Sequence, residues 1–96
     1  MDRIKKRIKA DGSIEELHRI VVHSFSVGDA EDPDIYAAQP LWEWQESEKG
    51  KWVMKHAVVK PTWLRDLDYY NFGYRYAIVA ELPGPRATEY YLKWGQ

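Results

Sequence analysis

Three histidines and a short acidic run are the groups in this 96-residue sequence best suited to chemistry. His18 and His23 are five residues apart, so on one strand their side chains would point to opposite faces and could not hold one metal. A histidine beside a carboxylate can act as a general base. The residues that could form such a pair are His23, His56, Asp29 and Asp32. A small enzyme is therefore one hypothesis, and solvated or hydrogen-bonded histidines are the plainer interpretation.

The acidic run 29–34 offers carboxylate oxygens of the kind that bind Mg²⁺ or Ca²⁺. It does not fit the calcium loop of an EF-hand, because Pro40 stands where the last acidic ligand belongs. The histidine spacing typical of zinc proteases is also missing. We expect neither a metal site nor a cofactor, and we interpret the run as a helix start with Asp32 as the capping residue.

The aromatic residues are the second group of interest, because the chain has five Trp and seven Tyr but only two Phe. Trp and Tyr combine a large apolar body with a polar tip, so they favour half-buried positions and interfaces. They fill the core of a small domain, or they form a binding surface. The residues that we expect to make contacts in the second case are Trp42, Trp44, Trp52, Tyr90 and Trp94.

A basic segment opens the chain and suggests a different kind of partner. Its candidate contacts for nucleic acid are Lys5, Lys6, Arg7 and Lys9. Single-stranded nucleic acid is held by cations that follow its phosphates and by rings that stack on its bases. The net charge is only −1, and the acidic run weakens the positive field. Nucleic-acid binding is therefore the alternative to a protein-binding role.

Composition limits the remaining classes. Hydrophobic residues make up 45% and charged residues 30%, which is typical of a globular domain, so we expect one domain over 1–96 with 1–13 as a possible mobile arm. Cysteine is absent, which excludes disulfides, thiolate metal sites and cysteine nucleophiles. The apolar run Tyr76–Ala80 is too short to span a bilayer. We expect a cytoplasmic protein that does not associate with membranes.

The order of strands and helices is partly ambiguous at the N-terminus. Ile4 and Ile8 suit a short helix that stops at Gly12, whereas Asp11-Gly12 also suits the turn of a hairpin between segments 3–10 and 14–20. The capping-box spacing of Ser13 slightly favours a helical turn. The segment 18–27 predicts an interior strand, because both of its faces are partly apolar.

The middle of the chain also has two interpretations. The segments 41–45 and 52–59 could be strands joined by a turn at 48–51. We favour a helix from Pro40 to about Ala57, because its acidic residues come early and its basic residues come late. Gly50 opposes this, since glycine costs about 1 kcal/mol inside a helix.

The C-terminal third predicts two strands. A ring-rich connection over 63–72 leads to a strand at 74–82, a turn at Pro83-Gly84-Pro85 and a last strand at 88–94. The fold class that we expect is α+β: an antiparallel sheet in the order strand, helix, strand, strand, with one main helix on one face and a basic arm in front.

This arrangement leaves too little cover for its sheet. One helix, about 10 Å wide, covers one face of three strands. The apolar residues of the two C-terminal strands fall on both faces: Val79 and Tyr91 on one, Ile78, Leu92 and Trp94 on the other. We therefore expect a homodimer or higher oligomer that forms through the open face or through edge strands. The alternative is that the rings of the 63–72 connection cover this face.

Four segments carry a resemblance: Gly28–Trp44, Glu48–His56, Gly73–Ile78 and Thr88–Trp94. With these segments the chain, over about residues 18–96, resembles small uncharacterised proteins of tailed phages, notably those of marine and cyanobacterial hosts. The resemblance implies no activity, ligand or site. It implies a phage accessory protein that acts in the cytoplasm of an infected bacterium, with a host protein as a possible partner.

Overall fold

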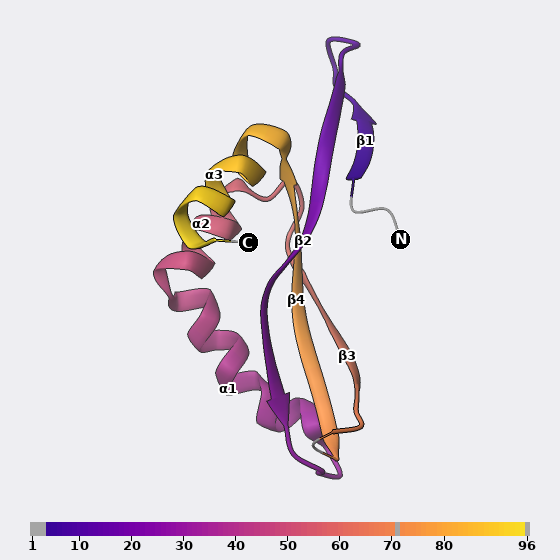
Figure 1. The fold of residues 1–96 in the computed structure, drawn as a ribbon, viewed down its shortest axis with the longest axis vertical. Helices are drawn as coiled ribbons and strands as arrows, with labels where there is room; N and C mark the ends of the chain where they lie inside the picture. The colour runs from indigo at the N-terminus through magenta and orange to yellow at the C-terminus, as the bar shows by residue number, and fades with distance from the viewer. Residues whose placement is uncertain (1–3, 71, 96) are drawn as a thin grey trace.

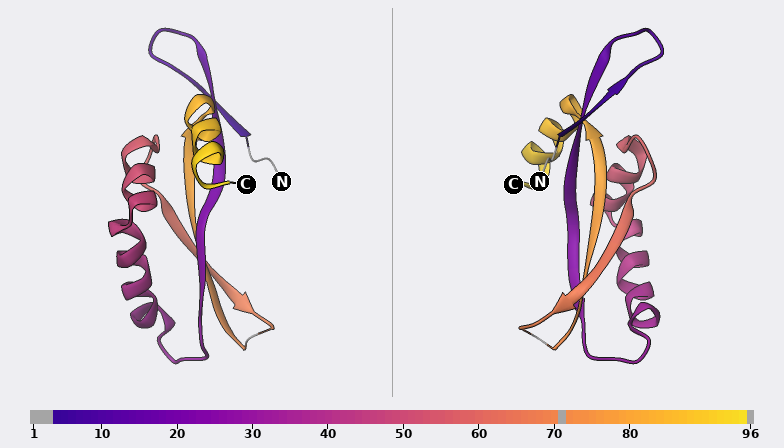
Figure 2. Two further views of the ribbon diagram at one scale, coloured as in Figure 1. Left: turned by 60° about the vertical axis from the view of Figure 1, so that its left-hand side comes forward. Right: turned by 90° about the vertical axis from the view of Figure 1, so that its right-hand side faces the viewer.

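The computed structural model describes residues 4–70 and 72–95, and in this part of the chain it contains four strands and three helices. Their bounds are β1 Ile4–Ile8, β2 Ile14–Val27, α1 Pro33–Glu46, α2 Glu48–His56, β3 Thr62–Asp68, β4 Gly73–Pro83 and α3 Gly84–Trp94. The strands form one antiparallel sheet in the order β1-β2-β4-β3. The helices lie together on one side of this sheet (Figures 1 and 2). The predicted α+β class is confirmed, and the predicted order of strand, helix, strand and strand is matched roughly, by β2, α1–α2, β3 and β4 with β1 before them and α3 after them.

The N-terminal segment forms a hairpin, so the hairpin alternative is confirmed and the helical one is wrong. Gly12 has a φ of 87°, which suits glycine in a tight turn. The Asp11 carboxylate accepts hydrogen bonds from the Ser13 amide at 2.9 Å and the Ser13 hydroxyl at 2.6 Å. The hairpin extends beyond the helical layer (Figure 1), and residues 1–3 of the predicted arm lie outside the described residues.

The helical interpretation of the middle segment is confirmed, but the helix begins earlier than predicted and is broken once. It begins at Pro33, and Ser47 separates α1 from α2. The Ser47 hydroxyl donates to the Trp44 carbonyl at 2.5 Å and accepts from the Gly50 amide at 3.0 Å. A Cβ at Gly50 would lie 1.8 Å from the Trp44 carbonyl oxygen. Glycine at this position therefore allows the first turn of α2 to pack against the end of α1.

Two predictions about the C-terminal half are wrong. The segment 88–94 belongs to α3, and the Pro83-Gly84-Pro85 sequence begins this helix instead of turning a hairpin. Proline is well tolerated in the first helical turn, where its missing N–H removes no hydrogen bond. The segment 63–72, which the sequence predicted to be a connection, is instead mostly the strand β3.

The core lies between the sheet and the helices. The sheet contributes Ile20, Val22, Ile78, Ala80 and Leu82, and the helices contribute Trp44, Val53, Ala87 and Tyr90. An irregularity in the β2–β4 register between Val21 and His23 places His23 and Phe25 opposite Ile78 and Tyr76, and so turns both rings to the helical side of the sheet. Three helices thus cover this face, where the sequence predicted one main helix.

The opposite face of the sheet is mixed in polarity. By strand alternation it presents Val21 and Val79, but also Arg19, Arg75 and Glu81. Tyr91 and Leu92, which we expected on the sheet, lie on α3 instead. No helix in the described ranges 4–70 and 72–95 is long and apolar enough to cross a membrane.

Candidate interaction surface

Large apolar residues remain exposed at both ends of the sheet, on the β1–β2 hairpin (Ile4, Ile8 and Ile14) and along the edge strand β3, where Trp63 is the largest. This strand pairs with β4 from Thr62 opposite Val79 to Asp68 opposite Gly73, and its other side has no neighbouring strand within the described residues. Six of its seven residues are exposed, and only Asp68 is buried. The exposed fractions are 44% for Trp63, 49% for Leu64 and 52% for Leu67.

The pairing with β4 determines which way each β3 side chain points. Trp63, Arg65 and Leu67 lie opposite Ile78, Tyr76 and Tyr74, so they point to the helical side of the sheet. The side chains that alternate with them, Thr62, Leu64 and Asp66, point to the open side. Both faces of the edge therefore carry at least one large apolar side chain.

Polar contacts anchor the middle of β3 to the start of α1. Arg65 donates to Asp34 at 3.2 Å, and the hydroxyl of the buried Tyr76 donates to the same carboxylate oxygen at 2.5 Å. The hydrogen bond with Tyr76 and the charge of Asp34 raise the pKa of Arg65. Burial, followed by the hydrogen bond to Asp34, raises the pKa of Tyr76. These contacts fix the edge strand against the helical layer, so its exposed side is held in an extended conformation.

A groove of about 290 Å³ borders β3 on the helical side. Its walls include Leu41, Trp42, Trp44, Met54, Pro61 and Trp63. Trp42 is 58% exposed at this groove, whereas Trp44 is buried, and the Trp44 Nε1 atom has no hydrogen-bond partner among the described residues. The groove joins the exposed side of α1 to the exposed edge of the sheet.

The turn after β3 continues the apolar surface. Tyr69, Tyr70 and Phe72 are all strongly exposed, and Phe72 has a φ of 51°. Gly73 is required beside them, because a Cβ there would lie 2.3 Å from the Val27 carbonyl oxygen. We call the six large apolar residues that are exposed on β3 and the turn after it the β3 edge patch. They are Trp63, Leu64, Leu67, Tyr69, Tyr70 and Phe72.

The aromatic residues predicted to make contacts mostly pack against one another. Trp44 and Tyr90 are buried in the core, and Trp52 and Trp94 are half-buried with ring centroids 5.2 Å apart. Trp42 alone among the five is largely exposed. The patch residues were not predicted as a surface, because a ring-rich segment at 63–72 also suits a cover for the sheet.

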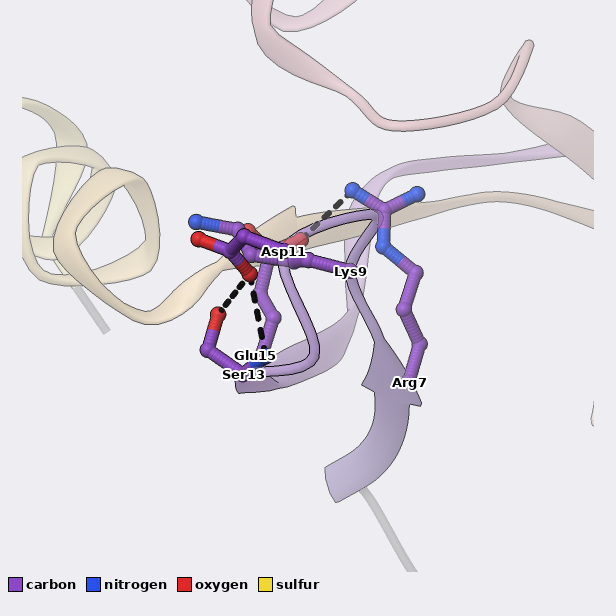
Figure 3. Close-up of polar contacts among 5 residues, drawn as sticks. All are labelled: Arg7, Lys9, Asp11, Ser13 and Glu15. Carbon is purple, nitrogen blue, oxygen red and sulfur yellow. Dashed lines mark hydrogen bonds and ion pairs between the residues drawn. The ribbon is translucent and has the colours of Figure 1, made fainter.

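The basic residues of β1 and its turn are largely paired with carboxylates. Arg7 lies 2.6 Å and Lys9 3.5 Å from Glu15, and Lys5 lies 3.6 Å from Glu81. Figure 3 shows Arg7 reaching across the hairpin to Glu15, next to the Asp11–Ser13 turn. Lys6 alternates with these residues and points to the other side of the hairpin. The positive field of this segment is therefore reduced at short range.

Two of the three histidines, His23 and His56, lie among aromatic rings, whereas His18 lies 4.0 Å from the Glu16 carboxylate. His23 is near the rings of Phe25 and Trp44, at 6.0 and 6.4 Å, and His56 lies 4.6 Å from the ring of Trp52. Burial is the main cause that lowers the pKa of both His23 and His56.

The acidic run makes structural contacts. Asp32 occupies the N-cap position of α1 without a side-chain capping bond, while Asp34 bonds Arg65 and Tyr76. Within the described residues, no cluster of three or more histidines and carboxylates could hold a metal ion. Comparison of the chain with protein-family models, with curated proteins and with solved structures gave no match.

Proposed function

We propose that the protein is a small homo-oligomeric binding protein, and that the β3 edge patch is its self-association surface. The observation that carries this proposal is an edge strand with six exposed residues, among them Trp63 and Leu64. An unprotected strand edge presents unpaired backbone N–H and C=O groups, and large exposed apolar patches mark sites of association. A second copy of the chain would pair with these backbone groups and cover the exposed apolar side chains.

The biological setting of the proposal comes from the resemblance to small phage proteins. It is an accessory role in the cytoplasm of an infected bacterium, in which the oligomer also binds a host protein. We infer a binding role rather than a catalytic one, because exposed apolar rings and a strand edge are the main features of this site.

Sedimentation velocity over a range of protein concentrations tests the self-association. We expect a species heavier than the 11.4 kDa chain at about 10–100 µM, the range of weak to moderate protein association. A single 11.4 kDa species at every concentration and at both low and high salt would overturn the proposal.

The alternative is a single-stranded nucleic-acid-binding protein, and one observation favours it. On α2 and α3, Lys93 lies 5.9 Å from the ring of Trp94, and Lys49 lies 5.2 Å from the ring of Tyr90. The ring of Trp94 is partly exposed and that of Tyr90 is buried, so the Lys93–Trp94 pair is the one that matches the chemistry of phosphate contacts and base stacking. Titration of the tryptophan fluorescence with a mixed-sequence oligonucleotide at about 50 mM salt tests it. An unchanged emission spectrum removes this alternative.

A further inference from the structure

We propose that two copies of the chain join edge to edge through β3, antiparallel, with Leu64 of one copy directly opposite Leu64 of the other. The inference rests on the proposed self-association and specifies its surface and register. It converts two four-stranded sheets into one continuous sheet, with the helices of both copies on the same side.

The choice between the two sheet edges follows from their charges. The other edge consists of β1, which carries Lys5, Lys6 and Arg7 in succession, and of β2 beyond His18, where the register irregularity between Val21 and His23 interrupts regular pairing. Self-pairing of β1 would place these cations against one another, which is destabilising for residues directly opposite across two strands. Edge lysines are a common means by which proteins prevent such pairing. β1 is therefore protected against a second copy.

β3 is less protected at its edge than β1, although it exposes Arg65 and Asp66 and the Asp66 carboxylate accepts a hydrogen bond from the Leu67 amide at 2.8 Å. It contains no proline and no lysine, and its pairing with β4 runs without a shift from Thr62 to Asp68. Its outer side is exposed over six consecutive residues. An extended, regular edge strand with exposed apolar side chains is a template for another strand.

The register follows from symmetry and charge. In an antiparallel pair with twofold symmetry, residues directly opposite each other point to the same face of the sheet. The twofold axis must therefore lie between one residue and the same residue of the second copy. An axis at Arg65 would place two guanidinium groups together, and an axis at Asp66 would place two carboxylates together. An axis at Leu64 places apolar against apolar and keeps most of the strand paired.

The remaining pairs in this register are complementary. Trp63 falls opposite Arg65 of the second copy on the helical side, where a guanidinium and an indole attract each other. Thr62 falls opposite Asp66 on the open side, a pair able to hydrogen-bond. Lys60, just before β3, lies diagonally across from the same Asp66. Each of these contacts occurs twice because of the twofold axis.

The absence of cysteine from the chain makes the register directly testable by crosslinking. In the full-length protein carrying Leu64→Cys, the two thiols lie opposite each other, and mild oxidation should give a covalent dimer on a non-reducing gel. The matched control is Val21→Cys, which is 59% exposed on the same face of the sheet but lies on β2, separated from the β3 edge by β4. We expect the Leu64→Cys dimer to form at least about tenfold faster than the control.

A second experiment tests the register without the central residue. Thr62→Cys and Asp66→Cys chains should crosslink poorly alone, because each residue lies opposite the other position. An equal mixture of the two variants should give the crosslinked heterodimer. Crosslinking of each variant with itself at the rate of the mixture would overturn this register.

The outcomes separate this inference from the proposed function. If the protein sediments as an oligomer but Leu64→Cys crosslinks no faster than Val21→Cys, the edge assignment is wrong and self-association stands. A Lys6→Cys variant that crosslinks faster than Leu64→Cys would point to β1 instead. A protein that is monomeric throughout overturns both. As a further check, Leu64→Lys should weaken the dimer at least about tenfold, because it places two ammonium groups together.

Discussion

Replacement of Gly50 by alanine tests the packing of the two middle helices, because helix propensity and tertiary structure predict opposite signs. On propensity alone, Gly50→Ala inside a helix raises the free energy of unfolding by about 1 kcal/mol. In this structure the added Cβ would lie 1.8 Å from the Trp44 carbonyl oxygen and 2.7 Å from its carbon. Both are backbone atoms, so the junction between α1 and α2 must open.

We expect Gly50→Ala to lower the free energy of unfolding by about 3 kcal/mol or more, the upper range for overpacking a filled site. For a domain of this size, that loss lowers the melting temperature by roughly 12–24 °C. Urea and thermal unfolding, followed by circular dichroism at one fixed protein concentration, measure the change.

The matched control is Gly28→Ala. A Cβ at Gly28 meets no atom within 4 Å, and its φ is not in the left-handed region, so the change should lie within about 0.5 kcal/mol of wild type. A Gly50→Ala protein that is as stable as wild type, or more stable, would refute the close packing of the first turn of α2 against the end of α1.

Two further predictions concern the polar contacts. Tyr76→Phe removes the buried hydroxyl that donates to Asp34 at 2.5 Å, and it should lower the free energy of unfolding by about 1.5–3 kcal/mol, the range for a hydrogen bond to a charged group. Urea unfolding measures this, and an unchanged midpoint would contradict the contact. The second prediction concerns pH. Burial lowers the pKa of His23 and His56 in the folded protein, so below about pH 6.5 the unfolded chain binds more protons than the folded one. The free energy of unfolding should therefore fall between about pH 7 and pH 5. His23→Gln should make this decline shallower, and a decline of the same slope in the variant would show that His23 does not contribute.

The ring-rich segment shows why the interaction surface was not predictable from the chain alone. Its residue types indicated large exposed or half-buried rings, and that part of the interpretation holds for Trp63 and Tyr70. Its role as a strand depends on β4, which pairs with it over seven residues. An edge is a property of a strand's place in a sheet, and no local pattern specifies which strand is last.

The C-terminal segment illustrates a different difficulty. Tyr90, Tyr91 and Leu92 are consecutive and apolar, a run that suits a strand as well as a helix. The sequence signal that indicates a helix is the spacing of Ala87, Tyr90 and Trp94, which share one side of α3. Ala87 and Tyr90 on this side are buried in the core, and this burial stabilises the helix.

The features that the sequence determined by itself are those that act over a few residues. Asp11-Gly12 ends the first element because glycine adopts a positive φ, although the sequence left open whether that element is a helix or a hairpin strand. The order of charges along the middle segment favours a helix because it complements the helix dipole. Tertiary structure alone decided that α3 is a helix, that Gly50 lies against Trp44 and that β3 is an open edge. These depend on burial against residues distant in the chain, and that free energy exceeds the small local preferences of any segment.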